Sequence, residues 1–171
     1  LLLVDDHTIV REGIKRILEK MGSDWSISEA GTGFDALDLV RHQVFDVAIV
    51  DLSMPGMNGA ELCRQTRRGD QEGAYTYFIL LSAFGDRAHV LGGMEAGADD
   101  FVAKPFDEGE LHARIRAGER ILRLSHELAR RLDQLVSANQ SNRQLNLQLA
   151  RDMQALVSSI NGWVSRESSV G

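Results

Sequence analysis

Residues 47–59 read VAIVDLSMPGMNG, and this stretch decides the fold. It begins with four consecutive apolar residues, Val47–Val50, continues with Asp51, and ends in a segment that contains Pro and Gly. A short apolar run bounded by turn residues is typical of a strand that is buried on both faces, as in parallel sheets covered by helices. We therefore expect a central strand whose carboxyl end carries an aspartate.

Similar apolar runs precede and follow this stretch, and amphipathic segments separate them. The other runs are Leu1–Val4, Trp25–Glu29, Phe78–Leu81 and Phe101–Ala103. The amphipathic segments are Thr8–Met21, Phe34–Arg41, Ala60–Arg68, Asp86–Ala96 and a helix from Asp107 onward. Strand and helix thus alternate five times, and right-handed crossovers favour an α/β fold. We predict a doubly wound five-stranded parallel sheet of flavodoxin-like order 2-1-3-4-5, followed by a long C-terminal helix.

Composition and charge exclude several classes of protein. The chain has 171 residues, of which 43% are hydrophobic and 26% charged, as is ordinary for a globular protein. Its net charge of −6 argues against a protein that coats nucleic acid or an anionic membrane. Its apolar runs are too short to cross a bilayer. Its single cysteine, Cys63, suits a reducing compartment, and we expect a cytoplasmic protein.

Charge and breaker residues divide the chain into two parts. Residues 1–118 carry 20 acidic and 12 basic side chains, whereas residues 119–171 carry 5 and 7. Most of the 16 glycines and both prolines also lie in the first part. We therefore predict a compact domain over 1–120, a helix over 121–164 and a frayed end over 165–171.

Polar side chains follow directly after four of the predicted strands. Asp5 and Asp6 come after the first strand, Asp51 after the third, Ser82 after the fourth and Lys104 after the fifth. Because parallel strands end at the same edge of a sheet, we expect these side chains to converge in the crevice beyond that edge.

The residue types at this edge indicate phosphoryl chemistry. Clustered carboxylates repel one another, and their oxygen atoms suit Mg²⁺. Asp51 is then a candidate nucleophile toward a phosphoryl donor, with Lys104 offsetting charge and Ser82 donating a hydrogen bond to a phosphoryl oxygen. Taken singly, each residue is more often a turn, cap or surface residue, so the prediction depends on their joint placement.

The motifs around these residues resemble the response-regulator receiver domain of two-component signalling. The matching segments are LLLVDDH at 1–7, VDLSMPGMNG at 50–59, LSA at 81–83 and GADDFVAKPF at 97–106. The resemblance implies a regulatory phospho-acceptor rather than an enzyme, in which Asp51 accepts a phosphoryl group from a sensor histidine kinase. It implies that Mg²⁺ is bound by Asp5, Asp6, Asp51 and the backbone carbonyl of Ser53. It implies that Lys104 and Ser82 contact the phosphoryl group, and that Ser82 and Phe101 form a switch pair. It also implies that a cis peptide bond precedes Pro105.

Some residues differ from the commonest pattern of this family, and His7 adjoins one of its motifs. The switch aromatic is Phe101 rather than Tyr, so its ring carries no hydroxyl. The fourth predicted helix contains Gly92 and Gly93, each of which weakens a helix by about 1 kcal/mol. These glycines either lower the stability of a signalling helix or allow that helix to pack closely against its neighbours. We interpret His7 as a structural or electrostatic neighbour of the acidic pair and not as a metal ligand, because no second His or Cys stands near it.

The tail shows a heptad pattern that predicts a coiled coil. With Leu132 at position a, the a residues are Ser125, Leu132, Asn139, Asn146, Met153 and Ile160, and the d residues are Ile121, Leu128, Leu135, Asn142, Leu149, Leu156 and Trp163. We predict a homodimer through residues 121–163. The small apolar e positions keep a four-helix arrangement open. The polar patch Asn139, Asn142 and Asn146 either fixes the register or marks a weak segment.

Two alternatives to the phosphorylation switch remain. SHEL at 125–128 resembles the start of the phosphoacceptor box of histidine kinases, but ARR follows it without the usual Thr-Pro. A phosphorelay protein that uses His126 and a receiver-like scaffold without phosphorylation therefore stay open. No helix-turn-helix, cyclase or phosphatase motif follows residue 119, so we expect no direct nucleic-acid contact. The net charge and the short apolar runs likewise predict no membrane contact. We expect that the natural start lies outside this sequence, and that the output is either the helix pair itself or a domain outside this sequence.

Overall fold

The computed structural model of the chain describes residues 1–22, 25–69, 75–83 and 87–167. The chain divides into two compact units, Leu1–Leu124 and Ser125–Gly171. Among the described residues, no helix combines the length and the apolar character needed to cross a membrane.

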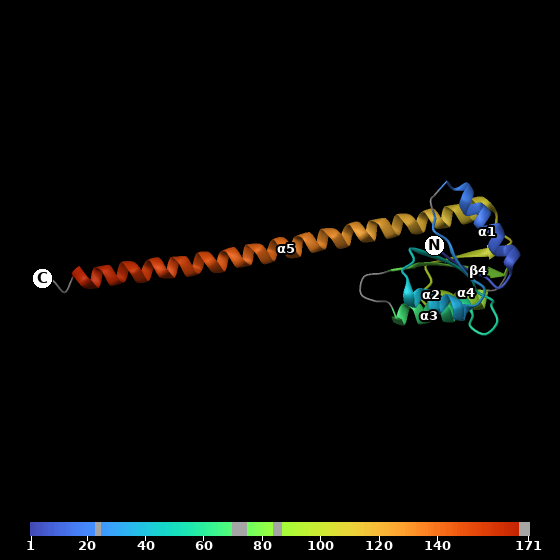
Figure 1. Ribbon diagram of the computed structural model, residues 1–171, viewed down its shortest axis with the longest axis horizontal. Coiled ribbons are helices and arrows are strands. Elements are labelled where there is room, and N and C mark those ends of the chain that lie inside the picture. Colours follow the sequence, from blue (N-terminus) through green and yellow to red (C-terminus); the bar gives the residue numbers. More distant parts are fainter. Residues whose placement is uncertain (23–24, 70–74, 84–86, 168–171) are drawn as a thin grey trace. The chain divides into compact units, whose positions relative to one another are not determined.

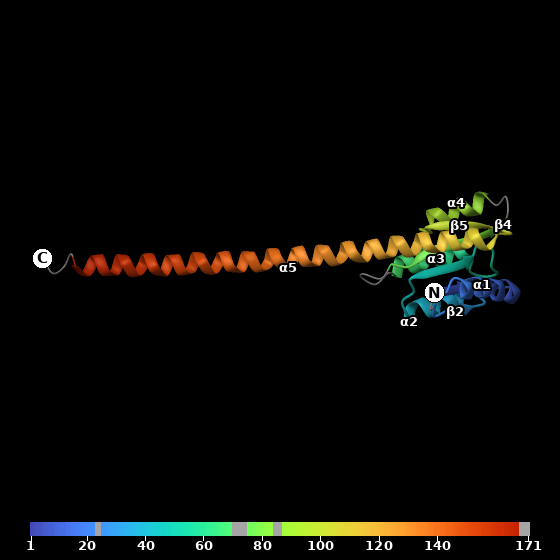
Figure 2. The same cartoon turned by 90° about the horizontal axis from the view of Figure 1, so that it is seen from above.

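The first unit is built on a parallel sheet with helices between its strands. The strands are β1 (Leu2–Val4), β2 (Ser28–Ala30), β3 (Val47–Asp51), β4 (Tyr77–Ala83) and β5 (Asp100–Lys104). The helices are α1 (Thr8–Lys20), α2 (Gly33–His42), α3 (Gly59–Gly69), α4 (Arg87–Glu95) and α5 (Glu108–Glu167). The strand order is β2-β1-β3-β4-β5, and every neighbouring pair is parallel, which confirms the predicted fold. Figure 2 shows β2 and β5 toward opposite edges.

The sheet is buried on both faces because two hydrophobic cores cover it. One core joins Val50 and Phe78 of the sheet to Leu37 of α2 and Leu62 of α3. The other core joins sheet residues such as Ile49 and Leu81 to α1 and the first turns of α5. Figure 1 shows α1 on one side of the sheet and α2, α3 and α4 on the other. This double cover explains why the strands are apolar at successive positions.

Cys63 of α3 belongs to the first of these cores. Its side chain is fully buried, and its thiol lies 3.6 Å from the carbonyl oxygen of Ala96. The thiol therefore packs as a small apolar group with a weak hydrogen bond.

The second strand begins later than the sequence predicts. The pattern places it at Trp25–Glu29, whereas β2 covers Ser28–Ala30. β1 has only three residues, and they pair with β2 from Leu2 opposite Ser28 to Val4 opposite Ala30. The length of β2 is thus set by its partner strand and not by its own apolar residues. The other predicted strands differ from the observed ones by one or two residues at an end.

α5 begins as part of the core of the first unit. Leu111 and Ile115 are fully buried, and Leu122 is 5% exposed, so the packed part of this helix continues past residue 120. The helix ends at Glu167, and residues 168–171 of the predicted frayed end lie outside the described residues.

The two glycines of α4 differ in their surroundings. A Cβ atom at Gly93 would collide with the side chain of Leu80, whereas a Cβ atom at Gly92 would meet nothing within 4 Å. Gly93 therefore lets α4 approach β4 closely, and Gly92 has no such packing role. Asp86, where the sequence pattern begins this helix, lies outside the described residues.

Candidate functional site

The predicted site residues lie at the carboxyl ends of four adjacent strands. Asp5 follows β1, Asp51 ends β3, Ser82 lies near the end of β4, and Lys104 ends β5. The order β1-β3-β4-β5 makes these strands successive neighbours. β1 and β3 flank the point at which the chain reverses its direction of winding, which is where doubly wound folds bind ligands.

Lys104 links the two buried carboxylates. Its Nζ atom lies 2.7 Å from Oδ2 of Asp5 and 3.0 Å from Oδ1 of Asp51. The Asp5 side chain is fully buried and that of Asp51 is 7% exposed. Burial alone would lower the pKa of Lys104, but hydrogen bonds to Asp5 and Asp51 outweigh it and raise the pKa above its ordinary value of 10.5. The ammonium group therefore stays charged at neutral pH and offsets two negative charges.

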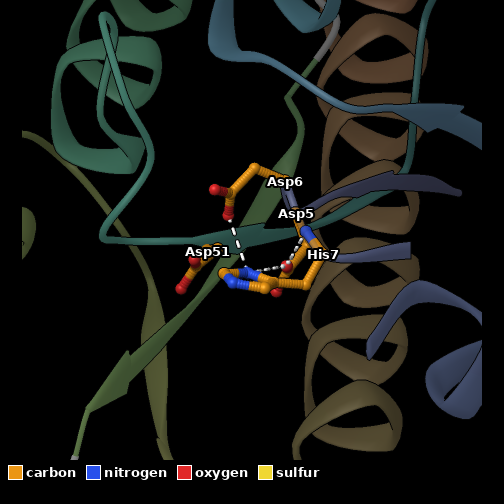
Figure 3. A group of neighbouring side chains, drawn as sticks. All are labelled: Asp5, Asp6, His7 and Asp51. Carbon is orange, nitrogen blue, oxygen red and sulfur yellow. Dashed lines mark hydrogen bonds and ion pairs between the residues drawn. The ribbon is translucent and has the colours of Figure 1, made fainter. Parts of the chain in front are cut away.

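The carboxylates of Asp5 and Asp6 also contact the imidazole of His7 (Figure 3). The Nδ1 atom of His7 lies 2.9 Å from Oδ1 of Asp6 and 3.3 Å from Oδ1 of Asp5. The backbone N–H of His7 also donates a hydrogen bond to Oδ1 of Asp5, at 2.8 Å. Asp5 thus uses one oxygen toward His7 and the other toward Lys104.

The donor set of this edge fits a divalent cation. Asp5, Asp6, His7 and Asp51 each offer one ligand atom, and these four atoms lie within 4.8 Å of one another. Carboxylate oxygens at the rim of a buried edge are the ligands that Mg²⁺ takes in proteins. The residues present therefore fit Mg²⁺. Ser53 is exposed in the loop after β3, and the role of its carbonyl oxygen stays a prediction.

The loop after Asp51 is held close to that residue. A Cβ atom at Gly59 would lie 2.5 Å from the carbonyl oxygen of Asp51, so only glycine fits there. The backbone N–H of Leu52 donates to the carbonyl oxygen of Leu81, and that of Gly59 donates to the carbonyl oxygen of Leu52. These contacts fix the main chain on both sides of the candidate nucleophile.

Ser82 and Phe101 occupy different environments. Ser82 is 2% exposed and lies opposite Ala103 of β5, one position after the Leu81 that pairs with Asp51. Phe101 is 40% exposed and thus partly open to solvent. The peptide bond between Lys104 and Pro105 is cis, which confirms the prediction for Pro105.

Two residues of the site were not assigned to it from the sequence. The sequence indicates only a neighbouring role for His7, yet His7 is one of the four residues whose possible ligand atoms lie within 4.8 Å of one another. Arg11 of α1 donates a hydrogen bond at 2.6 Å to the backbone carbonyl of Asp5 and so holds the chain that carries the acidic pair. The sequence feature that could have indicated a role for His7 in the site is its position directly after Asp6.

His126 and the apolar residues of the tail lie in the second unit. His126 is exposed on α5, as its b position predicts. The exposed large apolar residues there include Leu128, Leu132, Leu135, Leu149, Met153 and Leu156. These six occupy d or a positions of the predicted heptad pattern, whereas the exposed Val136 and Val157 occupy e positions and the exposed Leu145 and Leu147 occupy g and b positions.

Comparison with known proteins identifies the first unit. Residues 1–116 match the family model of the response regulator receiver domain. The transcriptional regulatory protein AfsQ1 of Streptomyces coelicolor is 40% identical over 117 residues, which are 68% of this chain and 49% of that protein. This chain thus spans about half the length of the curated relatives it matches.

Two solved structures share the fold. A response regulator from Chloroflexus aurantiacus is 32% identical, with a TM-score of 0.62 over 68% of this chain and 93% of that one. The receiver domain of the sensor histidine kinase PA1611 of Pseudomonas aeruginosa is 26% identical, with a TM-score of 0.60 over 71% and 94%. That domain was solved with a magnesium ion coordinated in its active-site cleft.

Proposed function

This chain belongs to the response regulator receiver family, and from that premise we propose that it is a switch controlled by phosphorylation of Asp51. The phosphoryl donor is a phosphohistidine of a sensor histidine kinase, and Mg²⁺ is the cofactor. The proposed role is that of a cytoplasmic regulatory protein and not of an enzyme with its own substrate.

The observation that carries the proposal is the placement of Lys104 between Asp5 and Asp51 at the edge where the winding reverses. The ammonium group of Lys104 contacts the carboxylate of Asp51, which is the nucleophile of the proposed transfer. The same ammonium group is in place to offset the charge of a transferred phosphoryl group.

In the proposed transfer, an oxygen of Asp51 bonds to phosphorus while the bond from phosphorus to the kinase's histidine nitrogen breaks. The nitrogen keeps the electron pair of that bond. Asp51, together with Asp5, Asp6 and the backbone carbonyl of Ser53, would hold Mg²⁺, which when bound would supply further charge compensation. Lys104 and the hydroxyl of Ser82 then hydrogen-bond to oxygens of the phosphoryl group.

The signal passes from the phosphoryl group to the surface of β5 and α4. Ser82 moves toward the phosphoryl oxygens, and the ring of Phe101, now 40% exposed, follows into the space beside it. Gly92 has a low helix propensity and so lowers the stability of α4, which eases repacking of that surface.

The tail carries the signal onward as a homodimer through residues 121–163. Five of its exposed leucines occupy a or d positions of the heptad pattern, namely Leu128, Leu132, Leu135, Leu149 and Leu156, and a helix cannot bury such a stripe by itself. The output is either the paired helices themselves or a domain that they control.

The test is intact-mass measurement after incubation with Mg²⁺ and a small acyl phosphate, on the wild type and on Asp51→Asn. One added phosphoryl group that is absent from the variant is the expected result. Phosphate found on His126 instead would favour the phosphorelay, and no phosphate together with no Mg²⁺ binding would favour the scaffold.

A further inference from the structure

The position of His7 is not explained by the helix that it precedes. His7 is the N-cap residue of α1, but its side chain makes no capping hydrogen bond. N-cap positions usually carry Ser, Thr, Asp or Asn, whose side-chain oxygens accept from the first turn. The imidazole of His7 is directed at the carboxylates of Asp5 and Asp6 instead (Figure 3).

Three potential ligand atoms meet at this point. Nδ1 of His7 lies 2.9 Å from Oδ1 of Asp6 and 3.3 Å from Oδ1 of Asp5. Two ligands bound to one Zn²⁺ ion at adjacent positions are about 3.0–3.4 Å apart, given bonds of about 2.1 Å and angles between octahedral and tetrahedral. The observed separations are close to this range, so small movements would place all three atoms around one ion.

The burial of these residues suits such a site. The Asp5 side chain is fully buried, and its other oxygen is bound to Lys104, so its Oδ1 atom is held in place. The His7 side chain is 68% exposed, so the ring can adjust from the solvent side without disturbing the core. Asp51 brings a further carboxylate within 4.8 Å.

The chemistry of the imidazole separates two classes of ion. In the tautomer that carries its proton on Nε2, Nδ1 holds a lone pair and is a metal ligand. Imidazole nitrogen suits Zn²⁺, Co²⁺ and Ni²⁺, whereas Mg²⁺ prefers oxygen ligands and retains several waters. Mg²⁺ therefore gains little from His7, and a transition-metal ion gains a ligand.

We propose that His7 is a nitrogen ligand that makes this site bind Zn²⁺ and related transition-metal ions more tightly than Mg²⁺. The inference rests on the proposed cation site and adds a second class of ion to it. Because both classes share the carboxylates of Asp5 and Asp6, a transition-metal ion would displace the Mg²⁺ used in phosphorylation.

The experiment measures the binding of Zn²⁺ and of Mg²⁺, each alone, to the full chain by equilibrium dialysis. It compares the wild type, His7→Gln and the control His42→Gln. His42 is matched, because its Nδ1 atom lies 3.8 Å from a carboxylate oxygen of Asp38 and its side chain is 73% exposed. We expect Zn²⁺ to bind the wild type at least tenfold more tightly than Mg²⁺. His7→Gln should weaken Zn²⁺ at least tenfold and Mg²⁺ less than twofold, and His42→Gln should change neither.

A second readout uses the wild type alone and needs no variant to fold. The imidazole ¹⁵N resonances of His7 should show the large shift of direct coordination on addition of Zn²⁺ and only a smaller shift on addition of Mg²⁺, which binds the neighbouring carboxylates. Unchanged His7 resonances with Zn²⁺, or equal Zn²⁺ affinity in His7→Gln and wild type, would overturn the inference. Neither result changes the expected phosphorylation of Asp51, which tests the proposed function separately.

Discussion

The ammonium nitrogen of Lys104 lies 2.7 Å from Oδ2 of Asp5, although 99 positions separate the two residues in the chain. They belong to β5 and to the residue after β1, and two other strands lie between these in the sheet. The same nitrogen lies 3.0 Å from Asp51, which ends one of the two intervening strands. One side chain thus connects three strand ends, and the buried carboxylates depend on it for charge compensation.

Replacing Lys104 by Met should destabilise the fold when Mg²⁺ is absent. The change leaves two buried carboxylates close together without their cation, and removing one partner of a buried ion pair costs about 3–5 kcal/mol. Urea denaturation in the presence of a chelator measures this difference. Lys20→Met is the control, because the ion pair of Lys20 with Glu108 is largely exposed and is worth about 1 kcal/mol or less. Equal midpoints for the two variants would contradict the prediction.

The contribution of Lys104 to stability should also depend on pH. Because its pKa is raised in the folded state, the stabilisation is fully present below the ordinary value of 10.5 and is lost as the pH rises through the higher folded pKa. The difference in unfolding free energy between the wild type and Lys104→Met should therefore stay constant from neutral pH to about 10 and shrink above it. Denaturation curves at several pH values test this; a difference that shrinks below pH 9 would argue against it.

The two glycines of α4 should respond in opposite ways to alanine. Gly92→Ala should stabilise the protein by about 0.5–1 kcal/mol, since alanine has the higher helix propensity and the space around Gly92 is open. Gly93→Ala should destabilise it, because the added methyl group meets the side chain of Leu80. Each variant serves as the control for the other in urea denaturation. Stabilisation of both variants would show that helix propensity alone governs this segment, and destabilisation by Gly92→Ala would contradict the prediction.

Tyr75 should ionise at unusually high pH. Partial burial and a hydrogen bond from its hydroxyl to Oδ1 of Asp99 raise its pKa to about 12. Asp99→Asn removes the carboxylate and should lower this pKa while leaving the effect of burial. Ultraviolet titration of the phenolate measures it, with Tyr75→Phe identifying which of the two tyrosines contributes each step. An unchanged titration in Asp99→Asn would mean that burial alone sets the pKa.

The tail should lose its self-association when a charge enters the apolar stripe. Leu132 is 53% exposed on the isolated helix, and Leu132→Glu would place a carboxylate in the proposed dimer contact. We expect the dimer dissociation constant to rise at least tenfold in sedimentation equilibrium. Gln144→Glu adds the same charge at an f position on the opposite face and should leave the constant unchanged. A monomeric wild type would rule out the proposed dimer.

The sequence was sufficient to predict the strands and their order, because apolar runs such as Val47–Val50 are local signals with one plausible arrangement. The convergence of Asp51 and Lys104 followed from the same reasoning, since both end parallel strands. The start of β2 was not predictable from its own residues, because the three residues of β1 set it. The contact of Arg11 with the carbonyl of Asp5 likewise depends on how α1 leaves the sheet.

The burial of Cys63 has a practical consequence for spectroscopy. It is the only cysteine of the chain, and its thiol is enclosed in the core between α3 and the end of α4. A maleimide or spin label would therefore react selectively with a cysteine introduced on the surface, without prior removal of the native thiol. Labels on α4 or on the heptad segment could then follow the proposed switch in an otherwise native protein.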